Sequence, residues 1–283
     1  MLTLFVVICC FLVIILRPLL PSFIVVFIFF LINMFPSTAA PGRQHTTRPI
    51  VTGTSVLGIV YDKGVLLAAD TLLSYGSMAK SQNAQRLRII PGTRTVIGAS
   101  GEYSDFQKIC ELLEQKALEE TTTSLMDSLY ADTSTAVTAA STWNYLRMVM
   151  YTKRSKFNPY WNDLIVAGTD EAGKPFLGWV DKIGTTIQDN FIATGFGGYL
   201  AMPLLREKWR PDLTEGEARA LLEDCMKILF YRDCRASSKI QLAKVEAGTT
   251  TEPLVSDPYQ LETSWDAPSF QAHAGDLGMD GGW

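Results

Sequence analysis

Histidine and paired cysteines are scarce in this sequence of 283 residues. Its two histidines, His45 and His273, lie far apart, and none of its five cysteines forms a Cys-x-x-Cys pair. A zinc site needs several such ligands at short spacings, so the sequence excludes one and predicts no metal. It also lacks an Asn-x-Ser/Thr glycosylation acceptor, and its cysteine count is odd. This pattern favours a reducing compartment over secretion.

An excess of positive charge is lacking as well. The chain has 25 Lys and Arg against 29 Asp and Glu, a net charge of −4. This balance argues against nucleic acid as a partner, because nucleic-acid binding depends on basic surface. The one basic cluster, Lys153 to Lys156, follows a helical pattern. We interpret it as the end of a helix, where cations interact favourably with the helix dipole.

The glycine motif of a dinucleotide site is incomplete. Residues 194–200, TGFGGYL, follow a predicted strand, but Leu200 stands where the fingerprint needs its third glycine. The surrounding strand–helix–strand unit is absent from the pattern too. We therefore predict no cofactor and no small-molecule substrate.

Residues 1–45 contain two arginines and no acidic residue. As a helix, the apolar run 2–16 would measure about 22 Å, short of the roughly 30 Å of a hydrocarbon core. Two prolines separate it from a second apolar run, 23–35, and no basic residue precedes it as in a secretory signal. We interpret residues 1–45 as a removable leader or a stretch wrongly joined to the reading frame; the alternative is a membrane anchor.

The rest of the chain contains strand and helix patterns without an internal repeat. Two apolar runs around Asp62-Lys63-Gly64 predict a hairpin over residues 54–70. Helices are predicted around 106–117 and 137–153, followed by three β segments at 163–170, 175–181 and 185–194. This order favours two antiparallel sheets flanked by helices, an α+β fold, over a regular βαβ alternation.

The clearest helix begins after Thr214. Its hydroxyl can cap the helix while Glu217 reaches back, which is a capping box. The predicted buried face consists of apolar residues at helical spacing: Ala218, Leu221, Leu222, Cys225, Met226 and Leu229. Cys225, like Cys110 on the earlier helix, is thus predicted as a small core residue.

A Gly-Thr pair at residues 53–54 opens the first strand of the predicted hairpin, and Asp70 closes the second. Such a hairpin brings Asp70 beside Thr54. Two interpretations of Thr54 follow. It is either a nucleophile whose own amine, freed by cleavage after Gly53, acts as the base, or an ordinary strand residue.

Five segments in compatible order resemble the proteasome beta subunits: GVLLAAD (64–70), IGASGEYSDF (97–106), PFLGWVD (175–181), ATGFGGYLA (193–201) and LFYRDCRASS (229–238). The resemblance implies the N-terminal nucleophile hydrolase fold, a four-layer α/β/β/α sandwich of two antiparallel sheets between helices. It also implies assembly with other proteasome alpha and beta subunits in stacked seven-membered rings. The expected location is the cytoplasm and nucleus, and association with a membrane is not expected.

The resemblance places the family's catalytic pocket on Thr54, Asp70, Arg86, Phe196, Asp233 and Ala236. The nucleophile and both aspartates are retained, but the family's lysine and two supporting serines are replaced by arginine, phenylalanine and alanine. Arginine stays protonated and presents a planar fork, so it cannot copy a lysine that moves protons beside the nucleophile. The resemblance therefore implies a non-catalytic subunit, in which Arg86 is available for a structural ion pair with Asp70.

Residues 46–58 resemble a non-catalytic member of the family whose mature chain begins before the Gly-Thr pair. The implied cleavage lies between His45 and Thr46, ahead of a beta-type domain at 46–248. Thr54 would then carry an amide nitrogen, which is not a base at neutral pH, and would be only a strand residue. An active threonine endopeptidase, with Thr54 freed by cleavage after Gly53, is the alternative.

From about residue 249 the chain loses its periodicity, and 249–283 is predicted to be a C-terminal extension without its own core. By the resemblance this extension reaches across to the opposite beta ring. Its spaced aromatic residues, Tyr259, Trp265 and Phe270, are predicted to supply apolar contacts with neighbouring subunits.

Overall fold

The computed structural model describes residues 48–128, 137–248 and 251–264, with the side chains of 124–128 left out. All of these residues belong to one compact unit, 46–283. Residues 1–45, the predicted cleavage site at His45 and Thr46, and the predicted contacts Trp265 and Phe270 lie outside the described residues. The predictions made for them remain predictions.

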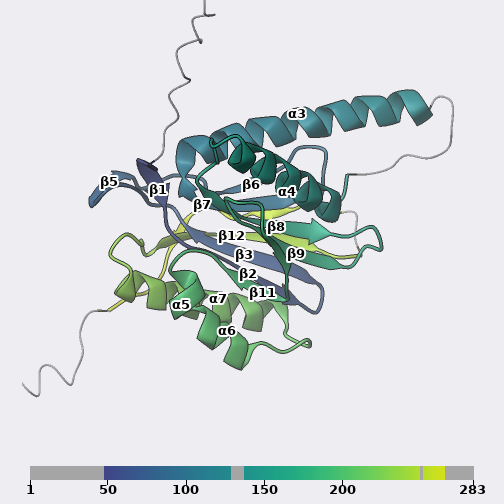
Figure 1. Ribbon diagram of the computed structural model, residues 1–283. Coiled ribbons are helices and arrows are strands. Elements are labelled where there is room, and N and C mark those ends of the chain that lie inside the picture. The colour runs from purple at the N-terminus through teal and green to yellow at the C-terminus, as the bar shows by residue number, and fades with distance from the viewer. Residues whose placement is uncertain (1–47, 129–136, 249–250, 265–283) are drawn as a thin grey trace, which may run out of the picture. The chain divides into compact units, whose positions relative to one another are not determined.

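Two antiparallel sheets form the centre of this unit (Figure 1). The first has eight strands in the order β10-β9-β8-β7-β1-β4-β5, with β6 also paired to β7. Its strands are β1 (Val51–Gly53), β4 (Leu73–Tyr75), β5 (Met78–Ser81), β6 (Leu87–Ile89), β7 (Val96–Glu102), β8 (Asn162–Thr169), β9 (Pro175–Val180) and β10 (Thr186–Gln188).

The second sheet has six strands in the order β11-β2-β3-β12-β13, with β14 also paired to β12. Its strands are β2 (Val56–Tyr61), β3 (Gly64–Asp70), β11 (Phe191–Ala193), β12 (Lys239–Glu246), β13 (Leu254–Val255) and β14 (Tyr259–Gln260). β2 and β3 form the predicted hairpin, with Val56 opposite Ala69 and Tyr61 opposite Gly64.

Helices cover the outer face of each sheet (Figure 1). The long α3 (Tyr103–Ser128) and α4 (Ala139–Ser155) pack on the first sheet, and α5 (Gly197–Leu200), α6 (Met202–Lys208) and α7 (Glu215–Arg232) pack on the second. The four layers confirm the predicted α/β/β/α sandwich, and they explain why the central strands are apolar on both faces.

Alternation along β3 illustrates how the three core layers form. Val65, Leu67 and Ala69 lie in the core between the two sheets, whereas Leu66 and Ala68 face the layer of α5 to α7. All of these side chains are buried, because successive residues of a strand point to opposite faces and both faces are covered. β3 therefore has no solvent side, and Asp70 at its end is buried with it.

The helix signals of the sequence are confirmed. Thr214 and Glu217 form the capping box of α7, and the six residues of its predicted buried face are all buried. α4 ends with Lys153 and Arg154 in its last turn, as expected for the basic cluster. The sulfurs of Cys110 and Cys225 are buried, and burial raises the pKa of each thiol to about 12.

Three features of the two sheets differ from the sequence prediction. The segment 185–194, predicted as one strand, divides at Asp189 and Asn190 into β10 in one sheet and β11 in the other. β4, β5 and β6 form between residues 73 and 89, where the sequence predicts no strand, and β1 precedes the predicted hairpin. These strands are short, and only their neighbours in the sheet supply the hydrogen bonds that stabilise them.

The start of the C-terminal extension folds back onto its own chain. β14 pairs with β12, and Leu261 is buried in the core beneath α7. The hydroxyl of Tyr259 donates to Glu223 at 2.7 Å, and its ring lies 5.2 Å from the guanidinium of Arg219. Tyr259 thus packs against its own α7, and its predicted contact with a neighbouring subunit remains a prediction.

Candidate functional site

Thr54 lies where the chain crosses from one sheet to the other. Gly53 ends β1 in the first sheet, and Val56 begins β2 in the second, so Thr54 and Ser55 belong to neither strand. The prediction of Thr54 as a strand residue is corrected on this point. Its backbone nitrogen is joined to Gly53, and its side chain is half-buried.

The residues before Thr54 are an integral part of the first sheet. β1 lies between β7 and β4, with Gly53 opposite Gly101 on one side and Leu73 on the other. The buried carboxylate of Glu102 accepts hydrogen bonds from the backbone N–H groups of Ile50 and Val51. Cleavage after Gly53 would therefore separate Thr54 from a strand held on both edges.

Asp70 brings the end of the hairpin against Thr54, as predicted. The Thr54 hydroxyl donates to one carboxylate oxygen of Asp70 at 3.1 Å, and the backbone N–H of Ser237 donates to the other at 3.0 Å. The Arg86 guanidinium forms an ion pair with the same carboxylate. Three different donors thus share the two oxygens of one buried carboxylate.

Arg86 occupies the centre of the site and is only 1% exposed. Besides its ion pair, its Nη2 donates to the carbonyl oxygens of Thr54 at 2.5 Å, Ser55 at 3.0 Å and Ala99 at 3.2 Å. A Cβ atom on Gly53 would collide with the guanidinium, so glycine is required there for this packing. The predicted pair of Arg86 and Asp70 is present, and it connects the two sheets through the Thr54 backbone.

The electrostatics of the pair follow from its burial. Burial raises the pKa of the Asp70 carboxyl, and the charge of Arg86, the Ser237 N–H and the Thr54 hydroxyl oppose that rise. Burial also lowers the pKa of the Arg86 guanidinium, which Asp70 counteracts. An arginine begins from a pKa above about 12, so the guanidinium remains charged and keeps its partner ionised. A charged guanidinium has no lone pair with which to accept a proton.

The other three predicted pocket residues form no hydrogen bond with the Thr54 hydroxyl in the described ranges. Asp233 follows the last residue of α7; one of its carboxylate oxygens accepts from the Arg235 N–H at 3.0 Å, and the other has no partner among the described residues. Its charge acts to raise the pKa of both Asp70 and Arg86, so Asp233 belongs to the surroundings of that pair. Phe196 is 52% exposed ahead of α5, and Ala236 packs against the core under α7. Direct bonds thus join three of the six positions, and Asp233 acts on two of them through its charge.

Some functional contacts of the site have no signal in the sequence. Ser237 and Ala99 act through their backbone, so their side-chain types do not reveal them. The Ser55 hydroxyl accepts from the Gly197 N–H at 2.8 Å, which connects the site to the start of α5. Glu102 lies within the family-like segment 97–106, but nothing in the sequence indicates that its carboxylate positions β1.

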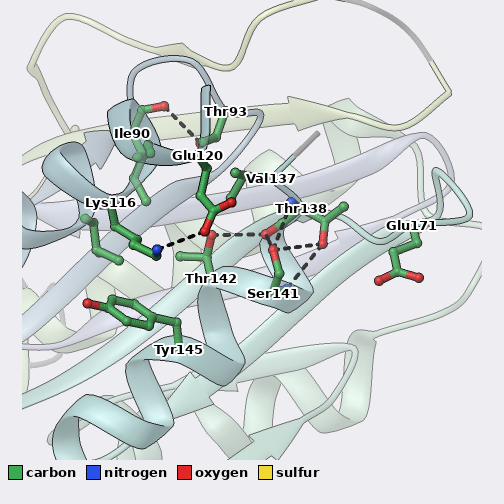
Figure 2. Close-up of a pocket in the computed structure, with 12 residues that line it drawn as sticks. Ile90, Thr93, Lys116, Glu120, Val137, Thr138, Ser141, Thr142, Tyr145 and Glu171 are labelled. Carbon is green, nitrogen blue, oxygen red and sulfur yellow. Dashed lines mark hydrogen bonds and ion pairs between the residues drawn. The ribbon is translucent and has the colours of Figure 1, made fainter. Parts of the chain in front are cut away.

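A larger pocket of about 660 Å³ lies elsewhere, between α3 and α4 (Figure 2). Lys116 is paired with Glu120 on its wall, and the hydroxyls of Thr138 and Ser141 bond to each other in the capping box of α4. These hydroxyls are used by the helix cap, and the described residues include no histidine that could act as their base. The described residues therefore do not arrange Thr138 or Ser141 as a nucleophile.

Within the described residues, no helix has the length and apolarity to cross a bilayer. In the same ranges, His, Cys, Asp and Glu side chains do not gather into a group suited to a metal ion.

Comparison with known proteins gives consistent matches. A family model described as "Proteasome subunit" matches residues 50–245. "Proteasome subunit beta type-4" of Arabidopsis thaliana is 43% identical over 241 residues, which cover 85% of this chain and 92% of the relative. The protein of the same name from Xenopus laevis is 41% identical, with 83% and 92% covered. "Proteasome subunit beta type-7" of Saccharomyces cerevisiae is 41% identical, with 75% and 80% covered.

These matches agree with the sequence motifs and with the observed fold. The family model spans both sheets and the helices α3 to α7. The relatives are matched over most of their own length, so the likeness is not confined to one motif. The chain therefore belongs to the proteasome subunit family, as a beta-type member that assembles with other proteasome subunits in the core particle.

Proposed function

We propose that this chain is a non-catalytic, structural beta subunit of the proteasome core particle. Its work is to present surfaces that position neighbouring subunits, so that the assembled particle degrades proteins at active sites carried by other chains. The observation that carries the proposal is the buried Arg86, which fills the place of the family's catalytic lysine and holds the Thr54 carbonyl.

Two features of Thr54 support this proposal. Its nitrogen lies in the peptide bond that follows β1, so it has no free amine while β1 remains in the sheet. Its hydroxyl already donates to Asp70, whose carboxylate is also engaged by Arg86 and the Ser237 N–H. Among the described residues, no neighbouring group is therefore free to take the hydroxyl proton and return it, which a nucleophilic threonine requires.

The finer parts of the assignment rest on the resemblance. We infer a place in a ring of seven different beta subunits, stacked on a like ring and capped by alpha rings. We further infer processing between His45 and Thr46, an extension after residue 248 that reaches the opposite beta ring, and a location in cytoplasm and nucleus. Pelleting of the mature chain with membranes after carbonate extraction would contradict that location.

N-terminal sequencing of the chain purified from its native complex tests the proposal. A terminus at Thr46 is the expected result, whereas a terminus at Thr54 would support the active protease. The same preparation should be treated with a covalent inhibitor of proteolytic threonines and analysed by mass spectrometry. A subunit of the same particle that reacts is the positive control, and a modified Thr54 hydroxyl would overturn the non-catalytic assignment.

A further inference from the structure

Phe157 is the one residue other than glycine with a positive φ in the described ranges. Its φ of 52° lies in the left-handed region, where a Cβ atom approaches the following carbonyl oxygen. It follows Lys156, which ends α4, and this position after a helix most often holds glycine. A bulky aromatic residue there carries a backbone strain that glycine would avoid.

The helix end explains the backbone conformation but not the side chain. The N–H of Phe157 donates to the carbonyl of Arg154 at 3.0 Å, and that of Asn158 to the carbonyl of Lys153 at 3.1 Å. These bonds satisfy carbonyls that the end of a helix leaves without partners. Because both are backbone bonds, glycine at 157 would make them equally well. The phenyl ring is therefore not needed for ending α4.

The ring does not contribute to the chain's own core either. Phe157 is 87% exposed, the highest value among the large apolar side chains whose exposure the structure describes. A single exposed apolar residue is ordinary in a soluble protein. Here, however, exposure coincides with backbone strain, and neither is required by the fold. The coincidence points to a contact outside the chain.

The surroundings of the ring are positively charged. Lys153, Arg154 and Lys156 precede it, and no ion pair within the described ranges includes Arg154 or Lys156. The Arg154 guanidinium lies 5.5 Å from the ring of Tyr151, and the Lys153 ammonium lies 4.8 Å from the ring of Tyr160. These contacts hold two of the cations close to the end of α4. We call Lys153, Arg154, Lys156 and Phe157 the α4 knob.

We propose that the α4 knob binds another subunit of the proteasome core particle, inserting Phe157 into an apolar pocket with an acidic rim. The phenyl ring of Phe157 would pack on the apolar floor of that pocket, and the three cations of the α4 knob would pair with the Asp or Glu side chains of its rim. The helix-ending hydrogen bonds already fix the backbone at Phe157, so little backbone freedom is lost on association. This inference rests on the proposed structural function, because it needs a neighbouring subunit.

Substitution of Phe157 by glycine separates this role from a role in folding. Glycine relieves the strain, so the urea midpoint of the Phe157→Gly chain should equal or exceed that of the wild type. Burial of a phenyl ring typically accounts for about 10- to 100-fold in a binding constant. Co-expressed with tagged wild type, the variant should therefore be depleted at least about tenfold in purified core particles relative to total chain.

Three further variants, one of them a control, keep the test decisive. Phe157→Asn serves if the glycine variant fails to fold, because asparagine also tolerates positive φ. Lys156→Glu should lower incorporation too, through repulsion from the acidic rim. Leu118→Gln is the matched control, because Leu118 is 65% exposed on α3, and it should incorporate like the wild type. Equal loss in the control, or normal incorporation of Phe157→Gly, would overturn the inference.

The partner can be identified by a photoreactive phenylalanine at position 157 in the assembled particle. We expect a cross-link to a different proteasome subunit, at a peptide with apolar residues flanked by Asp or Glu. Cross-links only to this chain, to a second copy of it, to nucleic acid or to lipid would refute the α4 knob. If the wild-type chain itself were absent from core particles, the proposed function would fail instead.

Discussion

The ion pair of Arg86 and Asp70 yields the sharpest prediction about this chain. In Arg86→Met an apolar chain of similar length replaces the guanidinium and leaves Asp70 buried without its cation. In Asp70→Asn the amide can still accept from Thr54, and the buried guanidinium loses its counter-charge. Both residues are only 1% exposed, so solvent cannot compensate for either loss.

The magnitude follows from the burial. Breaking a buried ion pair by removing one partner costs about 3–5 kcal/mol. For a domain of this size, that corresponds to a decrease of roughly 6–20 °C in Tm. Arg86→Met should be the more damaging change, because it also removes the donor to the carbonyls of Thr54 and Ser55. Asp70→Asn leaves the Arg86 donors to both carbonyls in place.

Urea unfolding followed by tryptophan fluorescence measures these values on the purified chain, and a double-mutant cycle isolates the pair. The combined variant should lose less stability than the two single variants summed, by up to about 3 kcal/mol. Strict additivity within about 0.5 kcal/mol would refute the pairing. Arg86→Lys serves as the charge-preserving control and should restore no peptidase activity, because Thr54 still lacks a free amine.

Three other perturbations have defined outcomes. Gly53→Ala should cost about 1–3 kcal/mol in urea unfolding, because the new methyl group displaces the buried guanidinium, and an unchanged midpoint would argue against that packing. In the helix cap, the Thr214 backbone N–H lowers the pKa of Glu217. The ionised Glu217 carboxylate therefore stabilises the fold above its unfolded pKa of about 4.3, and this stabilisation is lost as pH falls through the folded pKa. The urea midpoints of wild type and Glu217→Gln should therefore differ at neutral pH and converge once the pH lies below the folded pKa, whereas a constant difference would contradict the cap. At pH 8, an alkylating reagent should modify the exposed Cys234 and spare Cys225, because burial raises the pKa of Cys225 to about 12. Peptide mass spectrometry measures the labelling, and equal labelling of both thiols before unfolding would contradict the burial of Cys225 in the core.

Much of the fold was predictable because its signals are local. The capping box at Thr214 and Glu217 needs residues three apart, and the buried face of α7 needs only helical spacing. The hairpin over 54–70 and the contact of Thr54 with Asp70 follow from two apolar runs and one turn. The resemblance to the family added the stacking of the two sheets between layers of helices, which the spacing of residues alone does not supply.

The site needed the tertiary structure because its contacts join distant segments. β1 is three residues long, and it is stabilised by β4, β7 and the Glu102 carboxylate. The presence of Arg86 where the family has a lysine was visible in the sequence. Only the packing shows that the guanidinium fills the site and bonds to backbone carbonyls, which carry no sequence signal.

By itself, the sequence determined the helices α3, α4 and α7, the central hairpin and the family, because periodicity, caps and ordered motifs are properties of neighbouring residues. The tertiary structure decided that Thr54 lies between the sheets, that 185–194 divides between them, and that Tyr259 packs on its own α7. Each of these outcomes depends on hydrogen bonds and burial between segments far apart in the chain. Such interactions exist only once both sheets have formed.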